Sequence, residues 1–81
     1  MTPPDPHFPI NLTKAELQII HYIGQGLENQ EIAKKLCLKI GTIRNNITVI
    51  LEKTSLRNRT QLAVFAVQNG LTQESPETPV A

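Results

Sequence analysis

Three neighbouring polar residues could recognise DNA bases through hydrogen bonds and methyl contacts. Arg44, Asn45 and Thr48 stand close together in a segment with helical patterning. Arginine can donate two hydrogen bonds to guanine, asparagine can both donate to and accept from adenine, and the threonine methyl group can contact that of thymine. The same residue types also occupy ordinary helix surfaces, so their interpretation depends on the elements that position them.

The segment around these residues has an apolar stripe at helical spacing. Wound at about 100° per residue, the stripe gathers into about 100° of arc, which we expect to face the core. It consists of Ile43, Ile47, Ile50 and Leu51. The opposite side of the first two turns displays Gly41, Arg44, Asn45 and Thr48, with Val49 beside them. The pattern predicts a helix that begins near Gly41 and enters the major groove by its N-terminal half.

A shorter helix is predicted directly before this one, starting at Asn29. Asn29 is a good helix cap, and Glu31 lies in the first turn, where the helix dipole favours an anion. The residues expected to be buried are Ile32, Ala33 and Leu36. A short connection from Cys37 to Ile40 follows, with Leu38 as the expected inward anchor. A helix, a short turn and a second helix form the geometry in which the first helix braces the second in the groove.

The first helix of the chain is indicated by Thr13 and Glu16, which can form a reciprocal capping box. Leu12 and Leu17 are spaced for a hydrophobic staple across this cap. The expected buried stripe and the stop signals are Leu17, Ile19, Ile20 and Ile23, followed by Gly24 and Gly26. We interpret His21 within this helix as a packing or surface residue, because no acidic or cysteine neighbour stands at helical spacing.

A last helix is predicted from a second capping-box pair, Asn58 and Gln61, to a stop at Gly70. It is apolar nearly all round, and a small domain has little material to cover both sides. One lobe is Leu62, Phe65 and Ala66, and the other is Ala63, Val64, Val67 and Leu71. A spare apolar lobe most often marks an interface, so we expect the second lobe to form a two-fold homodimer. The alternative is that the first helix covers both lobes.

The chain ends differ in composition from the region between them. Thr2 to Pro9 holds four prolines, and the residues after Gly70 are polar, acidic and interrupted by proline. We therefore predict a disordered linker or tail over 1–10, one domain over 11–71 and a disordered tail over 72–81. The expected fold class is all-α, a four-helix bundle-like domain with a helix-turn-helix and a C-terminal dimerisation helix.

Charge is distributed unevenly along the chain. Residues 29–59 carry seven lysines and arginines against two glutamates, a net charge of +5, and the remaining residues carry −4. Such a split suits a cationic patch that binds phosphates on a nearly neutral molecule. The alternative is a solvated charged face without a partner.

Composition disfavours several classes of function. A chain of 81 residues closes one core, and no carboxylate pair or nucleophile with a base occurs at a usable spacing, so we expect no enzyme and no small-molecule ligand. Cys37, His7 and His21 do not make a zinc site, so we expect no metal or other cofactor and interpret Cys37 as a small buried residue. No apolar run of about 18 residues and no signal-peptide pattern occur, so we expect a cytoplasmic protein without membrane contact.

Several segments, in the correct order, resemble the LuxR-type (GerE-like) helix-turn-helix domains at the C-terminus of NarL- and FixJ-like response regulators and quorum-sensing receptors. The resemblance spans Leu12 to Leu71. Its segments are residues 12–16, 26–36, 41–47, 50–53, 58–64 and 69–71. It implies a bacterial transcription regulator that binds double-stranded DNA, either alone or as the effector domain of a longer protein.

The resemblance also implies roles for individual residues. Base edges would be contacted by Arg44, Asn45 and Thr48. The DNA backbone would be contacted by Thr42, Asn46, Lys53, Arg59 and Thr60, and we add Lys39 and Thr13 to that set. Dimerisation would use the last helix, through Ala63, Val64, Val67 and Leu71, and RNA polymerase is a further candidate partner.

Three positions depart from the family pattern. Lys39 stands where many members have serine or threonine, which puts a helix-capping or phosphate contact in doubt. Asn46 stands where histidine or tyrosine is frequent, which alters a backbone contact. Thr54 and Ser55 replace the usual Leu-Gly pair, which is expected to loosen the end of the recognition helix.

Two other interpretations remain open at this point. Region 4 of sigma factors has similar Glu-Ile-Ala and Gly-Thr-Ile-Arg patterns and reads a promoter element, but it does not normally need a long apolar helix after the recognition helix. A helix-turn-helix used only for contacts between proteins would instead direct Arg44 and Asn45 at a protein partner.

Overall fold

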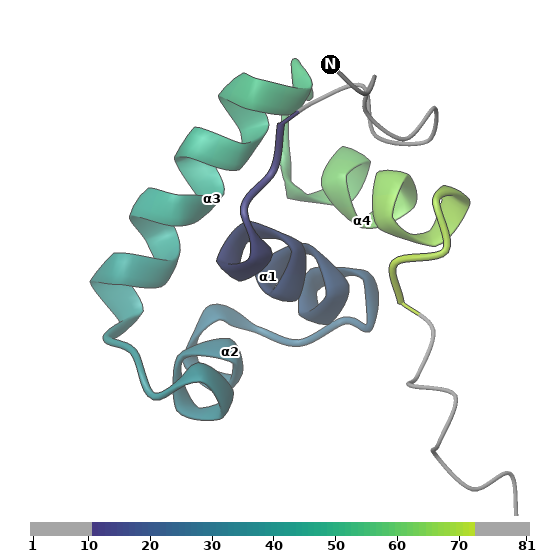
Figure 1. The fold of residues 1–81 in the computed structure, drawn as a ribbon. Helices are drawn as coiled ribbons and strands as arrows, with labels where there is room; N and C mark the ends of the chain where they lie inside the picture. The colour runs from purple at the N-terminus through teal and green to yellow at the C-terminus, as the bar shows by residue number, and fades with distance from the viewer. Residues whose placement is uncertain (1–10, 73–81) are drawn as a thin grey trace, which may run out of the picture.

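The computed structural model describes residues 11–72, which fold into four helices (Figure 1). They are α1 (Lys14–Gly24), α2 (Asn29–Leu36), α3 (Ile40–Thr54) and α4 (Arg59–Gln68). No strand occurs within these residues. α1 packs against α4 and α3, and α2 packs against α3. The expected all-α fold of four helices is therefore confirmed, whereas the tails predicted over 1–10 and 72–81 lie, apart from Thr72, outside the described residues.

The core is built from apolar residues of all four helices. The fully buried large side chains are Ile19, Ile20, Ile32, Ile43, Ile50 and Leu62. Leu17, Leu36 and Leu51, which the sequence places in the buried stripes, are only half-buried. Gly24 allows α1 to approach α4 closely, because a Cβ atom at this position would lie 2.8 Å from the Cβ of Ala66. No helix of residues 11–72 has the length and apolar character needed to cross a membrane.

The start of α1 follows the prediction. Thr13 Oγ1 accepts a hydrogen bond from Glu16 N at 3.1 Å, and the Glu16 carboxylate accepts one from Thr13 N at 2.8 Å. At the other end, Leu27 N donates to Tyr22 O at 3.1 Å, and Gly26 has a φ of 92°, which favours glycine. Both ends of α1 are thus determined by local side-chain and backbone chemistry.

The two ends of α2 correct three predictions. The cap of α2 is Glu28, whose backbone amide donates to Glu31 Oε1 at 2.9 Å, and Asn29 is the first helical residue instead. Cys37, expected to be buried, is exposed. Leu38, expected as an inward anchor, is 41% exposed. The reason is the left-handed backbone of Cys37, with φ of 57°, which turns the chain away from the buried face of α2.

The end of α3 accommodates its unusual sequence. Ser55 occupies the left-handed position, with φ of 59°, where glycine is favoured. Thr54 Oγ1 donates to Ile50 O at 2.8 Å, and Leu56 N donates to Leu51 O at 3.1 Å. The helix therefore ends in an ordered turn, although a serine in this conformation carries a steric cost that glycine would not.

The start of α4 is capped on one side as expected. Asn58 Oδ1 accepts from Gln61 N at 2.9 Å. The second hydrogen bond of a capping box, from Asn58 N to the Gln61 side chain, is not formed. Gln61 Oε1 instead accepts a hydrogen bond from Arg57 N at 2.8 Å. At the C-terminal end, Leu71 N donates to Ala66 O at 2.8 Å. The helix therefore ends before Gly70, as predicted.

Candidate nucleic-acid interface

The exposed side of α3 carries the three side chains that the sequence predicts to read bases. Arg44, Asn45 and Thr48 are all exposed, opposite the buried isoleucines of the same helix. The side chains of Arg44 and Asn45 have no hydrogen-bond or ion-pair partner within residues 11–72. Thr48 Oγ1 donates to Arg44 O at 3.2 Å, so its hydroxyl is turned toward its own helix. This surface offers two unoccupied hydrogen-bonding groups and a methyl group.

The N-terminus of α3 lies beside these residues and is electrostatically positive. The first amides of a helix have no partner within it, and the helix dipole adds partial positive charge there. Lys39, at the cap position, makes no side-chain capping bond, and the first turn holds no acidic residue. Thr42 is exposed, and its carbonyl accepts from Asn46 Nδ2 at 2.8 Å. The first turn of α3 can therefore receive an anion such as a phosphate.

α2 supports α3 from behind and adds charge to the same end of the molecule. Figure 1 shows α2 beside the N-terminal end of α3. The contact is apolar, because Ile32 of α2 and Ile43 of α3 are both fully buried. Lys34 and Lys35 are exposed in the last turn of α2. The two helices thus pack against each other, and α2 adds two exposed lysines in the turn that precedes α3.

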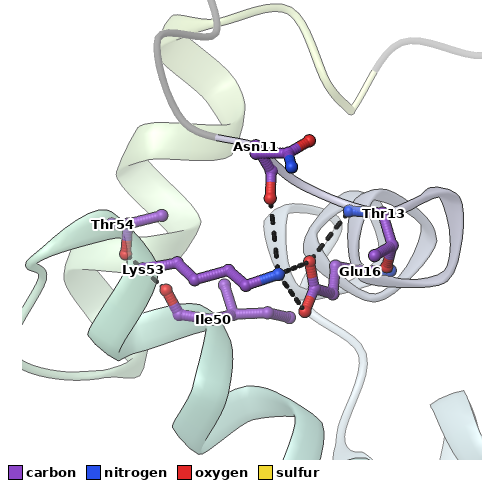
Figure 2. Close-up of polar contacts among 6 residues, drawn as sticks. All are labelled: Asn11, Thr13, Glu16, Ile50, Lys53 and Thr54. Carbon is purple, nitrogen blue, oxygen red and sulfur yellow. Dashed lines mark hydrogen bonds and ion pairs between the residues drawn. The ribbon is translucent and has the colours of Figure 1, made fainter.

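Lys53, at the far end of α3, is tied to the start of α1 (Figure 2). Its Nζ lies 2.8 Å and 3.0 Å from the two carboxylate oxygens of Glu16 and 3.3 Å from Asn11 O. The side chain of Glu16 is only 6% exposed and that of Lys53 is 34% exposed. A lysine ammonium has three donors, and three oxygens surround this one. Lys53 therefore joins α3 to α1 and can contact a phosphate only by sharing these donors.

The charge of Glu16 is kept by its partners despite burial. Burial by itself raises the pKa of this carboxyl group. The hydrogen bond from Lys53, the bond from Thr13 N and the positive charge of Lys53 together outweigh burial, so the pKa lies below the ordinary value of a glutamate. Glu16 is therefore ionised at neutral pH and forms an ion pair with Lys53 at 2.8 Å.

Arg59 is likewise engaged within the domain. Its Nη1 donates to Asn29 Oδ1 at 2.6 Å, and its Nη2 donates to the carbonyl of Leu27. These bonds join the first residue of α4 to the connection between α1 and α2. Asn29, which the sequence suggests as a cap, has its side chain in this contact instead. Arg59 therefore has a structural role beside any contact with DNA.

The predicted backbone-contact residues thus occupy three separate places. The group around α3 consists of Lys39, Thr42 and Asn46. Thr60 is exposed at the start of α4, and Thr13 is exposed at the cap of α1. Sequence reasoning did not identify Glu16 and Asn29 as partners of Lys53 and Arg59. No local signal could have done so, because 37 and 30 residues separate the members of each pair.

The outer face of α4 carries the predicted dimer surface. Val64 and Val67 are 48% and 58% exposed, whereas Ala63 and Leu71 are half-buried. Leu71 is held by its backbone, because its carbonyl accepts from His21 Nδ1 at 2.7 Å. A hollow of about 340 Å³ lies beside Val64, lined by Leu56, Thr60, Gln61, Val64, Phe65 and Gln68. α1 therefore covers only one side of α4, and the side with the two valines stays open.

No cluster of three or more histidine, cysteine, aspartate or glutamate residues that could hold a metal ion occurs in residues 11–72.

Comparison with known proteins identifies relatives of this chain. Residues 10–66 match the family described as bacterial regulatory proteins, luxR family. The chain is 39% identical over 62 residues to the transcriptional regulatory protein LnrK of Bacillus subtilis, covering 76% of this chain and 28% of LnrK. It is 44% identical over 61 residues to the transcriptional regulatory protein LiaR of the same organism, covering 75% and 29%. It is 37% identical over 62 residues to the response regulator protein VraR of Staphylococcus aureus, covering 76% and 30%. The chain thus spans less than a third of these relatives.

Proposed function

The chain belongs to the luxR family of bacterial regulatory proteins, and on this premise we propose that it binds double-stranded DNA sequence-specifically and regulates transcription. In this proposal α3 lies in the major groove, and its first two turns face the bases. The relatives LnrK and LiaR, which are named transcriptional regulatory proteins, support the role in transcription. Because the chain spans less than a third of those proteins, the proposal concerns the DNA-binding step and leaves out the signal that controls it.

The observation that carries the proposal is the pair of unoccupied side chains on α3. Arg44 and Asn45 are exposed and have no partner within residues 11–72. Neither side chain makes a hydrogen bond or ion pair that would stabilise the fold of residues 11–72. Arginine and asparagine are also the side chains that bind guanine and adenine through two hydrogen bonds each. We assign base contacts to Arg44, Asn45 and Thr48.

We assign backbone contacts first to the residues at the start of α3. Lys39, Thr42 and Asn46 lie beside the positive end of this helix, where phosphate oxygens can also accept from backbone amides. Thr60 and Thr13 are exposed and can donate from their hydroxyl groups. Lys53 and Arg59 stay in the proposal as weaker contacts. All three Lys53 donors face oxygens of Glu16 and Asn11, and two of the five Arg59 donors are bonded to Asn29 and Leu27, so fewer donors remain for a phosphate.

We also propose that two copies bind DNA together through α4. Val64 and Val67 are exposed and lie next to an apolar hollow. Burying the two valines against a second copy would remove apolar surface that α1 leaves in water. A two-fold pair would place two recognition helices on half-sites separated by about one helical turn of DNA, roughly 10 base pairs.

The direct test is a binding measurement on selected DNA. Duplexes enriched from a random pool would be labelled, and their affinity measured by fluorescence anisotropy at about 50 and about 200 mM salt. A protein that contacts several phosphates loses affinity steeply over this range. The proposal predicts enrichment of a defined sequence and a steep salt dependence. If no sequence is enriched and no duplex binds, the domain is not a DNA reader, and Arg44 and Asn45 would face a protein partner.

A further inference from the structure

We propose that Val49 is a specificity-determining residue that contacts the methyl group of a thymine in the half-site. The inference rests on the proposed function and extends it to a residue outside the three base-contacting side chains named above. In this proposal, two parts of α3 recognise different chemical groups of the bases. Arg44 and Asn45 in the first part of the helix bind by hydrogen bonds, and Val49 one turn later reads an apolar group.

The position of Val49 supports this role. Four residues separate it from Asn45, so the two side chains are neighbours on the surface of α3. Val49 is 40% exposed, while the isoleucine that follows it, Ile50, is fully buried. Val49 therefore stands on the solvent side of the helix, next to a side chain that we assign to base recognition.

Helix propensity does not favour a valine at this position. A β-branched residue in the interior of an exposed helix surface is less favourable than alanine, by up to about 0.7 kcal/mol on helix-propensity scales. Burial offsets only part of this cost, because 40% of the Val49 surface stays exposed. Among the exposed residues of the α3 reading face, it is also wholly apolar. An external apolar contact accounts for both features.

A phosphate does not suit Val49 as a partner, because a valine side chain has no hydrogen-bond donor. Glu52 is exposed three residues after Val49 and would repel a phosphate. Lys53, four residues after Val49, is committed to Glu16 at 2.8 Å. The only apolar group that a base pair presents in the major groove is the C5-methyl of thymine. Thr48 lies beside Val49, and its hydroxyl is bonded to Arg44 O. The methyl group of Thr48 is therefore a second candidate for the contact with thymine, and the test must distinguish the two residues.

The test replaces thymine by uracil, which removes the methyl group alone. The preferred duplex would be selected from a random pool with the unaltered protein, and each thymine would then be exchanged for uracil in turn. Dissociation constants would be measured for the unaltered protein, Val49→Ala, Val49→Ile and Thr48→Ser. Val49→Ala keeps the helix, because alanine has the higher helix propensity, and thermal unfolding followed by circular dichroism would verify this.

For the unaltered protein we expect at least one thymine per half-site, separate from any thymine that Thr48 contacts, at which uracil weakens binding about fourfold, the factor for one buried methyl group. Val49→Ala should abolish this difference, whereas Val49→Ile and Thr48→Ser should keep it. If the difference persists in Val49→Ala, or disappears in Thr48→Ser alone, Val49 does not read thymine. In that case DNA binding itself stands, whereas failure of the unaltered protein to bind any duplex would overturn the proposed function as well.

Discussion

Exchange of Glu16 for glutamine would remove the charge that holds the end of α3 against the start of α1. The carboxylate accepts two hydrogen bonds from Lys53 Nζ, at 2.8 and 3.0 Å, and one from Thr13 N at 2.8 Å. Glutamine keeps one acceptor oxygen for Thr13 but loses the charge and directs an amide NH₂ group toward the ammonium. A hydrogen bond to a charged group contributes about 1.5–3 kcal/mol. Because the Lys53 side chain is 34% exposed, water can solvate its ammonium group when this contact is lost, and the loss of stability is smaller. We expect the free energy of unfolding to fall by about 1–2 kcal/mol.

The matched control is Glu31→Gln at the start of α2. The Glu31 carboxylate also accepts a hydrogen bond from a backbone amide at the helix cap, Glu28 N at 2.9 Å, but Glu31 is exposed and has no lysine partner within residues 11–72. Exposed substitutions of this kind usually change stability by less than about 0.5 kcal/mol. Urea unfolding of both variants at neutral pH, followed by circular dichroism, measures the difference. Equal stability of Glu16→Gln and Glu31→Gln would refute the assigned role of the Glu16–Lys53 pair.

Acid provides a second readout for the same pair. The pKa of Glu16 lies below its ordinary value because the bonds and charge of Lys53 and Thr13 outweigh burial. A group whose pKa is depressed on folding stabilises the fold above its unfolded-state pKa, and this contribution is lost as pH falls through the folded-state pKa. The stability gap between the unaltered protein and Glu16→Gln should therefore be constant near neutral pH and shrink in acid. A gap that does not change between neutral and acidic pH would contradict this interpretation.

Three further predictions concern the reading face, the dimer surface and a helix end. Arg44→Ala should weaken binding to the selected duplex by about 1–3 kcal/mol and relax base choice at one position, measured by anisotropy on single-base variants of the site. An equal loss on every duplex would show that Arg44 contacts only phosphate. Val64→Asp should leave the circular dichroism spectrum unchanged but abolish cooperative binding to paired half-sites, because a buried charge opposes association; retained cooperativity would move the dimer interface elsewhere. Ser55→Gly should raise the unfolding free energy by about 0.5–1 kcal/mol, since glycine adopts the left-handed conformation with φ of 59° freely. An unchanged or lower thermal midpoint would mean that Ser55 makes a compensating interaction.

The sequence predicted most of what local interactions control. The capping box of Thr13 and Glu16 and the helix end before Gly70 are each formed by residues a few positions apart. The apolar stripe of α3 is decided by helical periodicity, which places Ile43 and Ile50 inside and Arg44 outside. Such features depend only on near neighbours in the chain. The sequence alone therefore predicts these helix caps and apolar stripes.

Short turns were less predictable from the sequence, because the backbone conformation of one residue changes the direction of every residue that follows. The left-handed conformation of Cys37 exposes both Cys37 and Leu38, although their apolar character suggests burial. The cap of α2 also moved by one residue, to Glu28, because either neighbour could satisfy the first amides of this helix. Composition alone does not distinguish between such options.

The amino-acid sequence by itself determined the four helices, their apolar faces and the exposed group of Arg44 and Asn45 on α3. Only the tertiary structure decided which charged side chains remain available to a partner. Lys53 and Arg59 look like free cations in the sequence, but folding brings them to Glu16 and Asn29, which lie 37 and 30 residues away. The physical reason is that an ion pair or hydrogen bond depends on distance in space. For residues on different helices, packing of the core sets that distance, and spacing along the chain does not.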